Sequence, residues 1–401
     1  MLYLLAARIA IQLTIAPVIA LMVVRITLLG HPAQSAALVQ SAVMTGLLVG
    51  AIGSYRIIHR LGYRPAFTTF CALIAGVVAL FPFLSSIATW MAVGAVMGVA
   101  AAALTVLTET WLHGLTANDH RGRIMGLYIL AGQFAAVLGM AATAAASPLS
   151  MTPFLIFALI VTLAALPVRF AAPPAVSVRR PRGMIRGAAL LLSRRPWPIF
   201  VIVVVGGALT GMQFGMLAVY VTQQTVLTVA APAVLALLLV GGMLIPYPLG
   251  LLSDRLGRTF TLCMTSVALA ATSMTLVYAL ESLALFLTCI VLLGGLASAI
   301  YPQGSAIIND DLPEDTRTAV NGGLMFSYSL GLLMGPVPAA LVMETFGHDA
   351  LFVLIASTCT LLLVGCVGRG LVSMLMPRTG RTTGRRSTPA PGPSDYADTD
   401  P

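Results

Sequence analysis

Long runs of apolar residues fill this chain, and short polar segments separate them. A run of about 20 apolar residues is long enough to cross the hydrocarbon core of a bilayer as a helix. The pattern therefore predicts twelve transmembrane helices, at residues 3–25, 34–54, 66–86, 88–111, 124–145, 151–169, 197–219, 230–251, 260–279, 283–305, 320–342 and 349–368.

Polar landmarks of the first six predicted helices recur in the last six. The segment beginning at His59 matches the segment beginning at Asp254, an offset of 195 residues, and the segment at Arg121 matches that at Arg317, an offset of 196. Parallel duplication of a six-helix unit is typical of secondary transporters, whose substrate site lies at mid-membrane between the two halves. The repeat thus favours a transporter with a central site.

The fold class that follows is an all-α membrane protein made of two parallel six-helix bundles. We expect an N-terminal bundle at residues 1–170, a basic cytoplasmic linker at 171–196 and a C-terminal bundle at 197–370. The last segment, 371–401, is polar and rich in proline, so it predicts a disordered cytoplasmic tail. Because the repeat already completes a two-bundle unit, a monomer suffices.

Composition and charge agree with a membrane location. Hydrophobic residues make up 59% of the chain and charged residues 9%, which leaves too little charge for the surface of a soluble protein. The net charge is +9, and all of the lysine-or-arginine positive charge is carried by arginine, since the chain has no lysine. Most arginines fall in the loops on one side, which the positive-inside rule assigns to the cytoplasm. Both termini are therefore expected in the cytoplasm of a cell with an inner membrane, and nucleic acid is not an expected partner.

One loop carries a recognisable motif. The segment Gly250-Leu-Leu-Ser-Asp254-Arg255-Leu-Gly257-Arg258 resembles the cytoplasmic loop signature of the major facilitator superfamily. The resemblance implies that these residues help to close the cytoplasmic side. The first-half copy has His59 in place of the aspartate, so its gate lacks the fixed negative charge. The gating-loop candidates are His59, Arg60, Gly62, Gly250, Asp254, Arg255, Gly257, Arg258, Arg121 and Arg317.

A second set of residues resembles a narrower branch of that superfamily. Thr108-Glu109-Thr110-Trp111-Leu112, with Tyr301-Pro302-Gln303 and Gly335-Pro336 further on, is similar to the YcaD-like bacterial inner-membrane transporters. The resemblance implies transport by alternating access, and it supplies no substrate.

Glu109 is the one acidic residue that the pattern places within a span, about one turn from the cytoplasmic end of the fourth helix. A carboxylate at membrane depth is costly unless it is paired or protonated, so it marks a functional candidate. One interpretation is a proton-coupling residue. The other is a structural ion pair with Arg60, Arg121 or Arg123 at the membrane edge.

Other polar groups at membrane depth are candidates for the wall of a substrate cavity. Each must find a partner in the bundle or face water. Arg8 and Arg25 could extend to the membrane surfaces, or one of them could face the cavity. The candidates for the cavity are Arg8, Gln12, Gln133, Gln213, Tyr301, Gln303 and Tyr328.

Other functional classes fit the sequence less well. The chain has no HExxH motif, no paired aspartates within its spans and no clustered zinc ligands, so we expect neither an enzyme nor a bound metal or cofactor. A membrane sensor that kept a transporter fold without flux is the alternative. The prediction is a secondary active transporter, coupled to protons, that moves a neutral or weakly charged small organic molecule. Its direction is undetermined, with efflux favoured.

Overall fold

The computed structural model describes residues 2–116, 121–171, 198–224, 227, 229–309 and 314–375, and throughout these ranges the regular elements are helices. Ten of the helices in this part of the chain are long and apolar enough to cross a membrane, and two shorter apolar helices, Thr152–Val168 and Ala350–Gly365, accompany them. The predicted linker, apart from Ala171, and the predicted tail beyond residue 375 lie outside the described residues.

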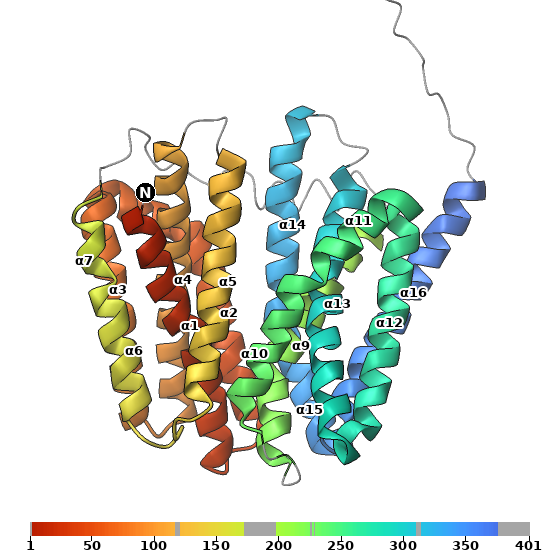
Figure 1. The fold of residues 1–401 in the computed structure, drawn as a ribbon, viewed down its shortest axis with the longest axis horizontal. Coiled ribbons are helices and arrows are strands. Elements are labelled where there is room, and N and C mark those ends of the chain that lie inside the picture. Colours follow the sequence, from red (N-terminus) through yellow and green to blue (C-terminus); the bar gives the residue numbers. More distant parts are fainter. Residues whose placement is uncertain are drawn as a thin grey trace, which may run out of the picture.

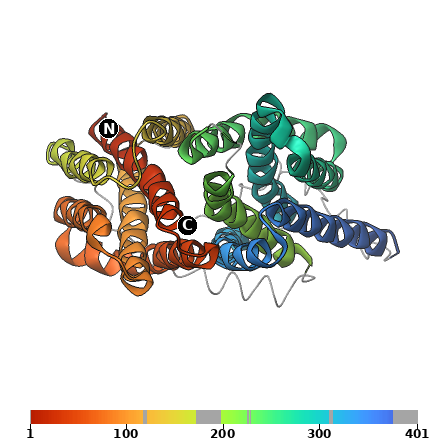
Figure 2. The ribbon, with the colours of Figure 1, turned by 90° about the horizontal axis from the view of Figure 1, so that it is seen from below.

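The helices form two groups that stand side by side (Figures 1 and 2). The first group comprises α1 (Leu2–Leu28), α2 (Ala33–Leu61), α3 (Tyr63–Leu80), η1 (Phe81–Phe83), α4 (Ile87–Leu115), α5 (Arg121–Thr143), α6 (Thr152–Leu163) and α7 (Ala165–Val168). The second comprises α9 (Pro198–Gln223), α10 (Ala231–Leu244), α11 (Pro246–Leu256), α12 (Arg258–Tyr278), η3 (Ala279–Glu281), α13 (Leu283–Asn309), α14 (Glu314–Met334), α15 (Pro336–Phe346) and α16 (Ala350–Leu375).

Three of the spans predicted as single helices are interrupted. The predicted helix 230–251 is divided into α10 and α11 before Pro246, and 320–342 into α14 and α15 before Pro336. The predicted helix 151–169 is divided into α6 and α7 at Ala164, three residues before Pro167. Proline lacks an N–H and its ring clashes with the carbonyl four residues earlier. A continuous apolar run therefore does not guarantee a continuous helix.

The two ends of the helices define two faces. Gly62 joins α2 to α3 and Gly257 joins α11 to α12, each with a positive φ (80° and 95°) that favours glycine. Arg60 and Arg255 lie exposed beside these turns, so we call this end the arginine face. The other end carries His31, and we call it the opposite face.

Glycines bring pairs of helices into backbone contact in both groups. A methyl group on Gly46 of α2 would overlap the carbonyl oxygen of Ala95 in α4. A methyl group on Gly241 of α10 would overlap the carbonyl oxygen of Val291 in α13 in the same way. Small residues allow such close approach between membrane helices. The two contacts are separated by 195 and 196 residues, so the packing repeats with the sequence.

The two groups are joined near the opposite face. The backbone N–H of Gln34, in the first turn of α2, donates a hydrogen bond to Glu344 Oε1 of α15 at 2.8 Å. The Ser41 hydroxyl, two turns further along α2, donates to the Leu333 carbonyl at 3.0 Å. Nearer the arginine face, the ribbons of α5 and α14 stand apart (Figure 1). The two hydrogen bonds therefore join the groups near the opposite face.

Candidate functional site

A cavity of about 250 Å³ lies where the two groups meet. The first group contributes α5, and the second contributes α9, α10, α13 and α14. The residues that line the cavity are Gln133, Thr210, Phe214, Leu238, Leu239, Gly242, Gly294, Ser298 and Tyr328. A small-molecule site typically combines apolar walls with a few convergent polar groups. The cavity has this composition, and both groups form its wall.

Tyr328 is the largest side chain on this wall, and its position is fixed by its neighbours. Its hydroxyl donates a hydrogen bond to Thr210 Oγ1 at 3.1 Å, and Thr210 in turn donates to the Gly206 carbonyl. The ring of Tyr301 packs against the ring of Tyr328, with centroids 4.7 Å apart. The ring of Tyr328 is therefore held in place before any ligand arrives.

Gln133 is the contribution of the first group to the cavity. Its side chain is half-buried, and no hydrogen bond among the described residues engages its amide. A primary amide offers two donors and one acceptor oxygen. At this depth there is little water to satisfy them, so Gln133 presents hydrogen-bonding groups to whatever occupies the cavity.

Next to Gln133 along α5, Gly132 contacts the Arg8 guanidinium of α1. A methyl group on Gly132 would come within 2.6 Å of Arg8 Nε, so glycine makes room for the arginine. The guanidinium carbon lies over the ring of Tyr128, 4.7 Å from its centroid. Arg8 Nε is buried and has no hydrogen-bond partner in the described part of the chain. Arg8 is thus held by cation–π and packing contacts.

Glu109 of α4 belongs to the same cluster. Its side chain is half-buried, and the charge of Arg8 acts on it. Its neighbour Thr108 shares a hydrogen bond of 2.8 Å with the Tyr128 hydroxyl. The arginines expected from the sequence as partners are placed differently: Arg60 and Arg123 are exposed, and the side chain of Arg121 lies outside the described residues. The structure thus brings Arg8, rather than Arg60 or Arg123, to Glu109.

Arg25 is buried near the opposite face, in the last turn of α1, and it does not border the central cavity. The side chain is 9% exposed and donates hydrogen bonds to the carbonyls of Pro148, Leu149 and Pro82, at 3.0, 2.6 and 3.2 Å. These carbonyls belong to the 144–151 connection and to η1, and they accept their hydrogen bonds from the arginine side chain. Arg25 therefore fastens the opposite end of the first group.

The remaining cavity candidates do not border the cavity. Gln303 is buried and donates to Thr265 Oγ1 at 3.1 Å, toward α12. Gln213 is 2% exposed and its Nε2 has no partner among the described residues. Gln12 is half-buried on α1, and Tyr301 reaches the cavity only through Tyr328. Of the seven candidates, the cavity brings together Gln133 and Tyr328.

The gating-loop candidates lie at the arginine face. Gly62 and Gly257 form the two turns with positive φ, and Gly250 lies within α11 with open space around it. Asp254 is exposed in the last turn of α11, and no side chain caps the start of α12. His59, Arg60 and Arg255 are exposed and Arg258 is half-buried. The side chains of Arg121 and Arg317 lie outside the described residues.

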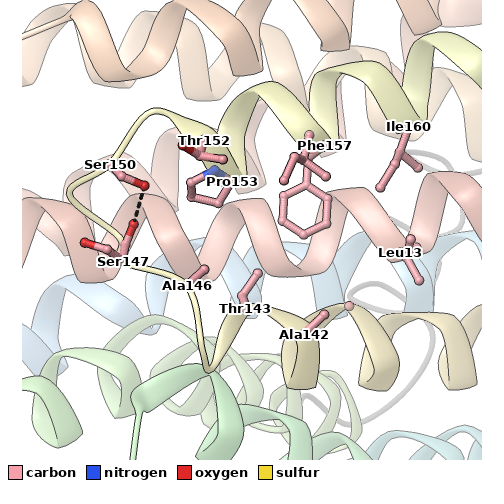
Figure 3. Close-up of a pocket in the computed structure, with 12 residues that line it drawn as sticks. Leu13, Ala142, Thr143, Ala146, Ser147, Ser150, Thr152, Pro153, Phe157 and Ile160 are labelled. Carbon is pink, nitrogen blue, oxygen red and sulfur yellow. Dashed lines mark hydrogen bonds between the residues drawn. The ribbon is translucent and has the colours of Figure 1, made fainter.

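Figure 3 shows another cavity, of about 370 Å³, between α1, α5 and α6. Apolar side chains such as Leu13 and Phe157 form most of its wall, and Ser150 donates its hydroxyl proton to the Ser147 carbonyl. Ile156 at its margin is half exposed on the outer surface of the bundle. This crevice lies within the first group, away from the contact between the two groups.

Three residues of the cavity carried no usable signal in the sequence. Thr210 and Ser298 are ordinary helical hydroxyl residues that bond to a carbonyl one turn earlier. Phe214 is one aromatic residue among many apolar ones. Only the way in which α9, α10, α13 and α14 meet α5 at the cavity distinguishes those that line it from the rest.

Comparisons with known proteins agree on one family. The profile of the Major Facilitator Superfamily matches residues 4–282 and 233–395. A transporter of that type from Yersinia enterocolitica is 28% identical over 342 residues, which cover 83% of this chain and 86% of the relative. The YcaD transporter of Salmonella dublin is 24% identical over 361 residues, 88% of each chain. Among solved structures, the nucleoside transporter NupG superposes with a TM-score of 0.79 at 13% identity, covering 92% of this chain and 98% of that one.

Proposed function

Because the chain belongs to the Major Facilitator Superfamily and is a multi-pass membrane transporter rather than an enzyme, we propose that it is a secondary active transporter of a small organic molecule. The observation that supports this function is the central cavity, lined by Gln133 from one group and Tyr328 from the other. A site between two groups is exposed to each side in turn when the groups rock. Efflux is the favoured direction, because most of the wall is apolar.

We further propose twelve spans in two parallel repeats, with bundles at residues 1–170 and 197–370. Packing contacts that recur at the repeat spacing support this division. Gly139 of α5 lies against the Leu13 carbonyl region of α1, and Gly335 lies against Ala208 of α9, so both members of the pair are shifted by 195 or 196 residues. The positive-inside rule assigns the arginine face to the cytoplasm of a bacterial inner membrane. The monomer contains both repeats.

The test of transport begins with a search for the solute. Purified protein is screened for ligands that raise its unfolding temperature, across metabolites, sugars, peptides and drugs, at pH 5.5 and 7.5. Each hit is then measured for flux into proteoliposomes, with empty liposomes as the control. Stabilisation together with flux supports the transporter. A ligand that stabilises the protein without any flux would favour a sensor instead.

Proton coupling is assigned to Glu109, with Arg8 as its charge partner. Replacing Glu109 with glutamine keeps the shape of the side chain and removes the proton site. We expect Glu109→Gln to lose at least tenfold of the accumulation driven by a pH gradient, while exchange of solute at equal pH continues. The measurement compares both modes in proteoliposomes. Glu281→Gln, an exposed change at the opposite face, is the matched control and is expected to behave as wild type.

A purely structural Glu109 gives another pattern. Glu109→Gln would then lower the unfolding temperature and reduce both transport modes equally, leaving their ratio unchanged. That result would remove proton coupling from this residue without affecting the proposal of transport.

The contact between α2 and α15 is proposed to close the opposite face. Pro32 at the start of α2 provides no side-chain cap for this helix. The carboxylate of Glu344 in the other group accepts the hydrogen bond from the Gln34 N–H in its place. A carboxylate at a helix N-terminus contributes about 0.5–2 kcal/mol. Glu344→Ala is therefore expected to shift the equilibrium toward opening of the opposite face by roughly 2- to 30-fold.

This shift is measured as the distance distribution between spin labels at Leu149→Cys and Tyr278→Cys, both exposed, in a background without the five native cysteines. Glu281→Ala removes another acidic side chain from the same face and serves as the control. Equal distributions for wild type and Glu344→Ala would contradict the assignment.

A further inference from the structure

The central cavity defines the kind of solute more closely than the family does. Its nine lining residues include no Asp, Glu, Arg, Lys or His. A charged group placed there would lose its hydration and gain no counter-charge, which is strongly unfavourable in a membrane interior. The solute that fits this wall is uncharged.

The second group presents hydrogen-bond acceptors to the cavity. The Ser298 hydroxyl donates its proton to the Gly294 carbonyl at 2.7 Å, Tyr328 donates to Thr210, and Thr210 donates to Gly206. Each hydroxyl has one proton, and all three protons are engaged. The oxygens of Ser298 and Tyr328 keep lone pairs, so the solute must bring an N–H or O–H donor to this side.

The first group presents a donor and an acceptor together. Within the described part of the chain no hydrogen bond engages the Gln133 amide, and its N–H and C=O lie side by side in one plane. Amide side chains of this kind pair in bidentate fashion with the edge of a heterocycle that has a donor beside an acceptor. Such an edge matches the C=O of Gln133 and one of its two N–H groups.

The remaining surfaces of the cavity are apolar. Tyr328, held by Tyr301 and Thr210, and Phe214 supply aromatic rings, while Gly242 and Gly294 let α10 and α13 approach each other closely at the wall. Aromatic rings favour stacked or edge contacts with another ring. The volume of about 250 Å³ lies below the range of about 300–1,000 Å³ usual for drug-sized ligands. The space is large enough for a small ring.

We propose that the transporter recognises an uncharged, planar heterocycle of one ring, whose donor–acceptor edge pairs with Gln133 and whose second N–H or O–H group donates to Ser298 or Tyr328. This inference rests on the proposed function and names its substrate class. Because Gln133 is the cavity residue of the first group, such a solute also bridges the two groups when it binds.

Three probes of similar ring size test the proposal by calorimetry on the purified full-length protein. Uracil is neutral and has two N–H groups, each beside a carbonyl. 1,3-Dimethyluracil keeps the ring and loses both donors, and orotate adds a carboxylate. We expect uracil to bind, dimethyluracil to bind at least tenfold more weakly, and orotate to bind at least tenfold more weakly than uracil.

Variants locate the binding. Gln133→Leu is expected to weaken uracil binding at least tenfold, whereas Gln12→Leu, the same change on α1 away from the cavity, leaves it within twofold. If Gln133→Leu fails to fold, Gln133→Glu provides the same test, because its carboxylate has no N–H to donate. Orotate binding as tightly as uracil, no binding of uracil, or an unchanged affinity in the Gln133 variants would overturn the proposal.

These failures are distinct from failure of the transporter itself. If a charged solute or a large one is carried in proteoliposomes while uracil is not bound, the substrate class is wrong and transport stands. If no solute crosses the membrane, the proposed function is wrong as well.

Discussion

Replacing Gly46 with alanine is expected to destabilise the first group more than replacing any other glycine of α2 with alanine. The added carbon would overlap the backbone carbonyl of Ala95, and a carbonyl within α4 cannot move aside as a flexible side chain can. The two helices would have to separate along their whole contact. Overpacking of a well-packed interior costs about 1–3 kcal/mol, and a backbone obstacle places this change at the upper end, about 3 kcal/mol.

The same helix supplies the control. Gly53 lies on α2 with nothing within 4 Å of the position of an added methyl group. Gly53→Ala is therefore expected to be neutral or to stabilise by about 0.5–1 kcal/mol, because alanine favours a helix over glycine. The apparent unfolding temperature in detergent should fall by several degrees for Gly46→Ala alone. Equal values for the two variants would show that the seam between α2 and α4 is not tightly packed.

Replacing Arg25 with methionine is expected to have a second large effect. Methionine resembles the aliphatic part of arginine and leaves the carbonyls of Pro82, Pro148 and Leu149 without their donor. Orphaned buried acceptors cost about 1–3 kcal/mol each, and part of this is recovered where water reaches the connection. We expect a loss of about 2–5 kcal/mol in the stability of the first group, in the range for breaking a buried charged contact.

Arg25→Lys should recover only part of this stability, because one ammonium group cannot reproduce the planar fork of the guanidinium. Arg169→Met, which removes an exposed arginine, is the control for the loss of positive charge. The measurement is again the unfolding temperature, together with protease cleavage of the 144–151 connection. An Arg25→Met protein as stable as Arg169→Met would show that the three hydrogen bonds contribute little.

Part of this architecture could be predicted from the sequence. The apolar runs predict an all-helical membrane protein, and the loop around Asp254 predicts the family, which the family profile confirms. Gln133 and Tyr328 could be selected because an uncharged polar group at membrane depth needs a partner or a wet surface. The positive-φ turns at Gly62 and Gly257 follow from the repeated loop pattern.

Contacts between distant helices could not be predicted in this way. Arg8 and Glu109 are about a hundred residues apart, and only the packing of α1 and α4 against α5 brings their charges together. In the sequence, Arg25 looks like an arginine near a helix end that extends to the membrane surface. The carbonyls that accept its hydrogen bonds belong to the 144–151 connection and to η1, and no sequence pattern marks these segments as its partners. A single amino-acid sequence carries no pattern that reveals such pairs.

The interruptions before Pro246 and Pro336 have a consequence for the mechanics of the two groups. At the repeat spacing, the first group has Ala51 and Met140 in their place, and α2 and α5 run without a break. A helix without the hydrogen bond that proline removes bends more easily than an intact one. At these two positions the duplication has therefore produced helices of unequal stiffness. We expect the α10–α11 and α14–α15 columns to bend more readily during rocking than α2 and α5, which occupy the same places in the first group.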